Sequence, residues 1–159
     1  MEHQDYMEQA LALAREAAVH GEVPVGCVIV KDKRIMTTGY NGAPRGRANC
    51  IDLNYCIRQQ RNVPRGTQYE LCRAIHAEAN AIIAASREEM IGSTLYLVGR
   101  DTQTGEIMRD ADSCPMCKRQ IINAGISQVV IRRDNDNYDV IDVADWVKND
   151  ELLGGKIGY

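Results

Sequence analysis

The chain has 159 residues, of which 45% are hydrophobic and 26% charged, a balance typical of a folded domain with a sizeable core. Its net charge of −3 disfavours binding to duplex nucleic acid, because proteins that neutralise phosphates are usually basic. No apolar run is long enough to span a membrane, and the polar start at residues 1–5 is unlike a signal peptide. We therefore expect one cytoplasmic domain over residues 1–159, with its six cysteines reduced and available for metals or chemistry.

The predicted elements alternate between helices and strands. Apolar residues at helical spacing predict a first helix over 6–20, and two extended runs, 25–30 and 34–40, predict a β-hairpin. Residues 41–69 have little periodicity and predict a long irregular segment. The elements expected after it are a helix over 71–85, a strand over 94–98, an excursion over 100–112, a helix over 114–124, a strand over 128–133 and a helix over 143–152. Such strand–helix–strand units favour parallel pairing in a sheet that helices cover.

Two short motifs place metal-binding side chains on neighbouring predicted helices. His76 lies in the second helix, and Cys114 and Cys117 open the third. Two thiols three residues apart at a helix start can turn toward one ion, and the helix dipole favours their thiolate forms. Three protein ligands leave the fourth tetrahedral position for water, which indicates a catalytic zinc. Glu78, two residues after His76, is then predicted to transfer protons between that water and a substrate.

The same residues also fit plainer interpretations. One is a structural zinc, or a core histidine next to unrelated cysteines. Another is a non-catalytic zinc module that contacts a protein or a nucleic acid. A structural site has no use for an unliganded carboxylate beside the metal, so Glu78 favours an enzyme.

Longer stretches of the chain resemble a known family. Residues 76–82 (HAEANAI) resemble the zinc-binding block of the cytidine and deoxycytidylate deaminases. Residues 39–46, which begin Gly-Tyr-Asn-Gly, and residues 121–126 are similar to the deoxycytidylate branch. One departure is Ser113, where the family usually has proline before the first cysteine. The resemblance implies an α/β fold with three α-β-α layers, in which helices cover both faces of a mixed five-stranded sheet.

The resemblance also implies a reaction and its contacts. It implies hydrolytic deamination of dCMP to dUMP and ammonia, with Asn41 bound to the sugar hydroxyl or the base edge. It further implies that the Ala77 amide meets the pyrimidine carbonyl and that main chain near Ser113 meets the leaving amino group. Asn41 equally fits a plain turn, since Asn-Gly is a common turn pair. Residues 22–26 (EVPVG) resemble tRNA adenosine deaminases instead, which leaves a purine base or tRNA adenosine as an alternative substrate.

A second metal site is predicted around the irregular segment. Four further soft or borderline ligands lie within this segment or on either side of it: His20, Cys50, Cys56 and Cys72. Four protein ligands would close the coordination sphere of a structural zinc. The chain in this respect resembles microbial deoxycytidylate deaminases, in which a second zinc ties the same loop to the first helix. The alternative is that these cysteines are small buried hydrophobes, as we predict for Cys27.

Recognition of a nucleotide requires a positively charged side chain that contacts its phosphate. Arg132 and Arg133, at the end of the predicted strand 128–133, are candidates for the phosphate contact, although they also fit solvated residues at a strand end. The irregular segment carries five more arginines, which predict either a phosphate-bearing effector or a solvated basic loop: Arg45, Arg47, Arg58, Arg61 and Arg65. The resemblance implies dCTP and dTTP as effectors and a homo-oligomer, commonly a hexamer. We expect no membrane or nucleic-acid partner.

Overall fold

The computed structural model describes residues 3–16, 24–49, 53, 57–64 and 74–149. Its centre is a five-stranded sheet with the strand order β2-β1-β3-β4-β5. β3 and β4 pair in parallel and the other neighbours pair antiparallel, which confirms the expected mixed sheet. The strands are β1 (Val25–Lys31), β2 (Arg34–Tyr40), β3 (Thr94–Gly99), β4 (Gln128–Arg132) and β5 (Tyr138–Asp142).

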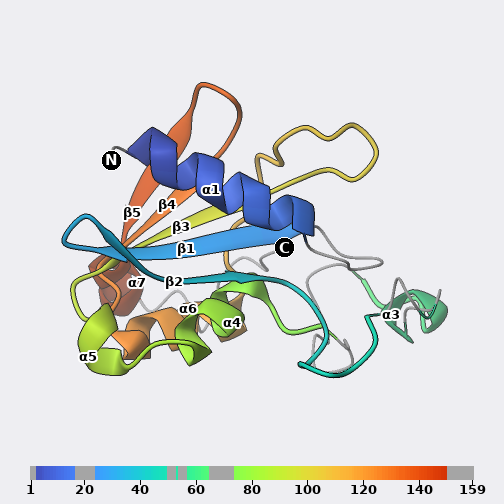
Figure 1. Ribbon diagram of the computed structural model, residues 1–159, viewed down its shortest axis with the longest axis horizontal. Helices are drawn as coiled ribbons and strands as arrows, with labels where there is room; N and C mark the ends of the chain where they lie inside the picture. Colours follow the sequence, from blue (N-terminus) through green and yellow to red (C-terminus); the bar gives the residue numbers. More distant parts are fainter. Residues whose placement is uncertain (1–2, 17–23, 50–52, 54–56, 65–73, 150–159) are drawn as a thin grey trace.

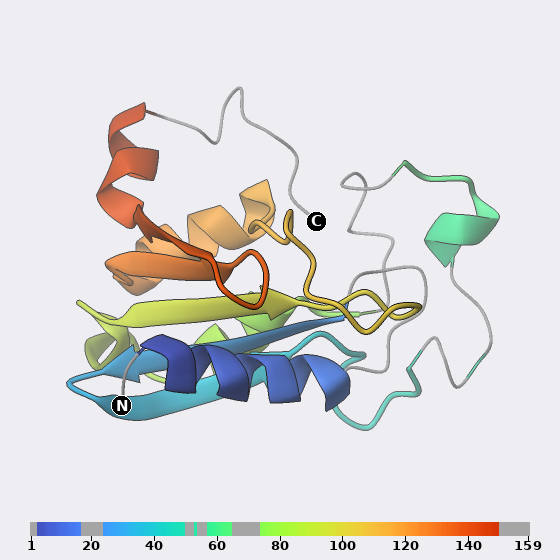
Figure 2. The same ribbon diagram turned by 90° about the horizontal axis from the view of Figure 1, so that it is seen from above.

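Helices lie on both faces of the sheet, which confirms the three-layer α/β architecture. α1 covers one face, and α4, α6 and α7 lie on the other (Figure 1). The short α3 stands away from the sheet in both views (Figure 1 and Figure 2). The helices are α1 (His3–Glu16), α3 (Ile57–Gln60), α4 (Ala77–Ile83), α5 (Arg87–Met90), α6 (Pro115–Ala124) and α7 (Val143–Asn149). No helix in the described part of the chain has the length and apolar character of a bilayer span.

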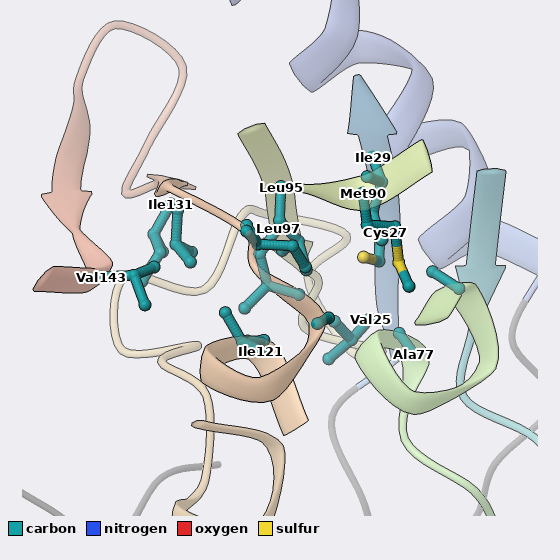
Figure 3. Packing of buried hydrophobic residues seen from close by; sticks show 14 of the residues in the cluster. Val25, Cys27, Ile29, Ala77, Met90, Leu95, Leu97, Ile121, Ile131 and Val143 are labelled. Carbon is teal, nitrogen blue, oxygen red and sulfur yellow. The ribbon is translucent and has the colours of Figure 1, made fainter. Parts of the chain in front are cut away.

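The two faces of β1 contribute to two separate cores, because successive side chains on a strand point to opposite faces. Val28 packs with Tyr6 and Met7 of α1 in one core. Cys27 and Ile29 belong to the other core, where Figure 3 shows them on the side of the strand that faces α4. Cys27 is fully buried there, which confirms the prediction that it is a core residue.

Two glycines let α1 and α4 lie directly against the hairpin backbone. A Cβ atom at Gly26 would lie 1.8 Å from the carbonyl oxygen of Ala10 in α1. A Cβ atom at Gly39 would lie 2.5 Å from the carbonyl oxygen of Ala77 in α4. Any larger residue at either position would push a helix away from the sheet, and at Gly39 that helix follows directly after the predicted ligand His76.

Most predicted elements are present, with shifted ends. The helix expected over 71–85 begins at Ala77, so His76 is its N-cap rather than an interior residue. The helix expected over 114–124 begins at Pro115, and Gly125 ends it in the left-handed conformation, with φ 82°. The described part of the first helix ends at Glu16, and residues 17–20 of that prediction lie outside the described ranges.

The strand β5 and the short helices α3 and α5 were not predicted. β5 is a mostly exposed edge strand with two acidic residues, so it lacks the apolar alternation that identifies buried strands. α3 and α5 have four residues each, too few to produce a helical repeat of apolar residues.

Candidate active site

The three predicted zinc ligands lie together and are buried. The side-chain ligand atoms of His76, Cys114 and Cys117 all lie within 4.8 Å of one another. The Nδ1 atom of His76 lies 3.5 Å from the Sγ atom of each cysteine. Tetrahedral zinc with Zn–N and Zn–S bonds of about 2.0 and 2.3 Å would separate the nitrogen from each sulfur by about 3.5 Å. The cluster therefore has the donor set and the spacing that a zinc ion requires.

Two helix starts bring the ligands to the same place. His76 is the N-cap of α4 and Cys114 is the N-cap of α6, both with extended backbone. Pro115 occupies the first turn of α6, where its missing N–H costs nothing because that group has no helical partner. Cys117 follows within the first turn of α6, so both thiols lie at the positive end of the helix dipole.

Electrostatics in the cluster favour one thiolate. The hydrogen bond with Cys117, and then the contact with His76, lower the pKa of Cys114 to about 4. The same hydrogen bond to Cys114, followed by burial and the charge of Glu78, raises the pKa of Cys117. Of the two coupled thiols, Cys114 is therefore the more acidic.

Glu78 is fully buried beside these sulfur atoms. Burial, and then the negative charge of Glu78, raise the pKa of Cys27, and the same charge acts on Cys117. A carboxylate that influences both thiols lies close to the metal position without belonging to the ligand cluster. This is the placement that a proton-transfer group needs.

The segment that contains Asn41 is joined to the start of α4. Gly42 and Ile75 form an isolated antiparallel bridge, with N···O distances of 3.1 and 2.7 Å. The side-chain nitrogen of Asn80 also donates to the carbonyl oxygen of Tyr40 at 2.9 Å. The structure therefore brings Asn41 beside the residue that precedes His76, although 35 positions separate Asn41 and His76 in the sequence.

Asn41, Ala77 and Ser113, the residues expected to contact substrate, are all buried near the cluster. Ser113 is 1% exposed, and its hydroxyl has no hydrogen-bond partner within the described part of the chain. A buried hydroxyl without a partner is costly, so this position suits a bound polar group. The roles of these three residues toward a substrate stay predictions.

Arg132 and Arg133 point to opposite sides of the sheet. Arg132 is 4% exposed and contacts Glu8 of α1 at 2.8 Å, on the face away from the metal cluster. Its other nitrogens donate to the carbonyl oxygens of Asp134 and Asn135. Arg133 instead contacts the Asp112 carboxylate, just before Cys114. The phosphate role of both stays a prediction, and these contacts argue against it for Arg132.

The four predicted ligands of the second zinc lie outside the described residues: His20, Cys50, Cys56 and Cys72. Arg65 of the basic segment also lies outside them. Arg58 is buried and donates to the carbonyl oxygen of Pro64 at 3.0 Å, so it is not a solvated residue of a basic loop.

Sequence reasoning missed two residues that support the site. Asn80 lies one helical turn after His76, and that spacing is a signal that both residues share a face of α4. Asp112 belongs to the excursion over 100–112, to which the sequence assigned no role. Its partner, Arg133, is 21 residues away, so no local pattern could have identified the pair.

Comparisons with known proteins agree with this site. The family described as the cytidine and deoxycytidylate deaminase zinc-binding region matches residues 1–133. Deoxycytidylate deaminase of Mycobacterium phage D29 is 36% identical over 143 residues, which cover 85% of this chain and 100% of the relative. Deoxycytidylate deaminase of Schizosaccharomyces pombe is 35% identical over 127 residues, which cover 79% of this chain but only 35% of the relative.

A solved structure supports the fold. The dCMP deaminase of cyanophage S-TIM5 in its apo form superimposes with a TM-score of 0.58 at 22% identity, covering 94% of each chain. With the family match spanning residues 1–133 and the His-Cys-Cys cluster in place, the chain belongs to the cytidine and deoxycytidylate deaminase family.

Proposed function

We propose that residues 1–159 act as one zinc-dependent deaminase domain that converts dCMP and water to dUMP and ammonia. The observation that carries the proposal is the buried cluster of His76, Cys114 and Cys117, with the Glu78 carboxylate beside it. Three protein ligands are typical of a zinc site that keeps one position for chemistry. The choice of dCMP is supported by the deoxycytidylate deaminases of Mycobacterium phage D29 and Schizosaccharomyces pombe, which are both more than 30% identical to this chain.

Zinc, when bound here, lowers the pKa of a coordinated water toward neutrality and so supplies a nucleophile at physiological pH. The protein's own part is to place and move protons. Glu78 takes the proton of the attacking water, delivers it to ring nitrogen N3 of cytosine, and then helps the amino group leave as ammonia. Burial of Glu78 keeps bulk water from competing for these protons.

Three buried residues would orient the base. The Ala77 amide would donate to the pyrimidine carbonyl, and main chain at Ser113 would accept from the amino group. Asn41 would bond the sugar hydroxyl or the base edge. Their support is position: Ala77 follows ligand His76, Ser113 precedes ligand Cys114, and the Gly42–Ile75 bridge holds the Asn41 segment against them.

Selectivity for a nucleotide over a nucleoside requires a positively charged side chain near the 5′-phosphate. Of the two predicted residues, only Arg133 lies on the side of the sheet that leads to Cys114. A phosphate contact by Arg133 would require it to exchange part of its contact with Asp112 for phosphate. A charge-assisted bond of about 1.5–3 kcal/mol would favour dCMP over deoxycytidine by roughly ten- to a hundredfold in kcat/KM.

The proposal extends to a second, structural zinc and to partners. His20, Cys50, Cys56 and Cys72 would hold that zinc, because they lie within and on both sides of the long segment whose sequence predicts no core of its own. By analogy with the family, dCTP and dTTP would act as effectors on a homo-oligomer, with a hexamer as the expected state. A reducing compartment such as the cytoplasm suits the enzyme, since metal binding needs the cysteines as thiolates.

The test is ammonia release by the zinc-loaded protein from dCMP, deoxycytidine, cytosine, guanine and adenosine. Glu78→Gln protein serves as the control for contaminating deaminases. The proposal requires dCMP to be the best substrate, with deoxycytidine at least tenfold poorer in kcat/KM. Turnover of guanine or adenosine in place of dCMP would instead establish the alternative, a deaminase of purine bases or of tRNA adenosine, which the two relatives do not favour.

A further inference from the structure

The guanidinium group of Arg133 connects three segments that meet at the end of β4. Its terminal nitrogens donate to both carboxylate oxygens of Asp112, at 3.0 Å each. Nη1 also donates to the carbonyl oxygen of Arg109 at 2.6 Å, and Nε donates to Asp139 at 2.8 Å. The Arg133 side chain is only 16% exposed, whereas Asp112 and Asp139 are 41% and 61% exposed, so the contact with Asp112 is the better shielded of the two ion pairs. One side chain thus joins β4, β5 and the last residues before α6.

Asp112 lies two residues before the ligand Cys114, in a buried stretch of chain. Ala111 and Cys114 are fully buried, and Ser113 is 1% exposed. Close packing on both sides leaves such a stretch little freedom to move alone. A group that fixes Asp112 therefore fixes the entry to α6 and the direction from which Cys114 approaches the metal position.

The other described contacts of the excursion hold it less firmly. The chain returns to the sheet at Met108, whose amide donates to the carbonyl oxygen of Gly99 at 2.9 Å. Arg109 then pairs with Asp134 at 2.6 Å, but the Arg109 side chain is 70% exposed. Exposed ion pairs of this kind contribute little, because solvent screens them. The mostly buried Arg133 is the stronger connection between the excursion and the sheet.

We propose that Arg133 is a positioning residue of the metal centre, which holds Cys114 in place for zinc through its bidentate contact with Asp112. Only arginine has a planar fork that matches both carboxylate oxygens, whereas lysine offers a single point charge. Groups that orient metal ligands from outside commonly change metal affinity by about 10- to 100-fold. The inference depends on the zinc site of the proposed deaminase but not on its substrate.

The test measures how fast zinc leaves the protein. Zinc-loaded wild type, Arg133→Lys and Arg133→Ala are mixed with an excess of a chromogenic chelator, and the release rate is followed by absorbance. Arg109→Ala is the matched control, because it removes an arginine ion pair of the same excursion but leaves the backbone carbonyl that Arg133 contacts. Thermal unfolding of each variant shows whether it is folded at the temperature of the assay.

We expect both Arg133 variants to release zinc at least roughly tenfold faster than wild type, and Arg109→Ala to match wild type. If Arg133→Ala does not fold, Arg133→Lys, which keeps the charge, decides the question. Wild-type release rates in a folded Arg133→Lys protein would overturn the proposal. Unchanged zinc release together with a higher KM for dCMP, but not for deoxycytidine, would also overturn it and make Arg133 a phosphate contact. Because zinc release needs no substrate, failure of the dCMP assignment would leave this result unaffected.

Discussion

The side-chain oxygen of Asn41 accepts a hydrogen bond from the backbone nitrogen of Val25 at 2.8 Å. Asn41 is fully buried, and it follows directly after β2, opposite the start of β1. The side chain therefore has a part in closing the β1–β2 pair. Because its side-chain oxygen already accepts from the Val25 amide, we expect its side-chain nitrogen to be the atom that contacts a sugar hydroxyl or a base edge.

Replacing Asn41 by alanine should reduce both stability and substrate binding. The buried Val25 amide would lose its side-chain acceptor, which costs about 1–3 kcal/mol in free energy of unfolding. Chemical denaturation measures this loss, and Asn49→Ala is the control. Asn49 accepts from the Ala43 amide in the same way, at 2.9 Å, but in a partly exposed position where water can replace it. Equal losses in the two variants would show that burial of Asn41 has no special effect.

Glu78→Gln should keep zinc and fold but lose nearly all turnover. Glutamine preserves the shape of the buried side chain and removes only its ability to carry a proton. Loss of general acid–base catalysis costs roughly 10²- to 10⁴-fold in rate. Zinc content by atomic absorption and kcat for dCMP are measured on the same sample. A fully active Glu78→Gln enzyme would exclude Glu78 from the mechanism.

Cys114→Ala and Cys117→Ala should each lose the catalytic zinc, because two remaining protein ligands hold the ion poorly. Cys27→Ala is the matched control, since Cys27 is equally buried and lies near Glu78 but outside the ligand cluster. We expect this control to retain zinc and to lose only a little stability from the small cavity. Zinc loss in Cys27→Ala would mean that Cys27 takes part in the metal site.

Native protein should contain two zinc ions per chain if the second cluster exists. Cys56→Ala should lower the count by one and reduce thermal stability, because a closed zinc site contributes folding free energy. The same variant should keep its catalytic zinc, which a cobalt-exchanged spectrum of the remaining site would show. A count of one in native protein, with all cysteines other than Cys114 and Cys117 freely titratable, would end the second-site proposal.

The chemistry of the site could be predicted from short stretches of sequence. His76, Glu78, Cys114 and Cys117 were identified because metal ligands and their helper group occur at characteristic spacings near helix starts. The hairpin was also predictable, since two extended runs flank a two-residue turn at Asp32 and Lys33, both of which have positive φ. These features depend on residues close together in the chain, so local physical rules apply to them directly.

Other features depended on how distant segments pack. The edge strand β5 carries too little apolar pattern to be predicted, and it forms because β4 offers it backbone partners from Gln128 to Arg132. The exact start of α4 at Ala77 could not be predicted from the sequence either. The bridge between Gly42 and Ile75 keeps the chain extended up to His76. A pattern of apolar residues along the helix does not indicate a contact with a segment so distant in the sequence.

By itself the sequence determined what the site contains, namely one imidazole, two thiols and a carboxylate, because those residue types carry their chemistry wherever they lie. Only the tertiary structure decided what the neighbouring Arg132 and Arg133 do. Side chains alternate along extended backbone, so Arg132, the last residue of β4, and Arg133, the residue after it, project to opposite sides. Arg132 meets Glu8, 124 positions away on α1, while Arg133 meets Asp112, 21 positions away and next to the metal ligands. Which partner each arginine finds depends on the strand order and on the helices that cover each face, and no pattern within the strand contains that information.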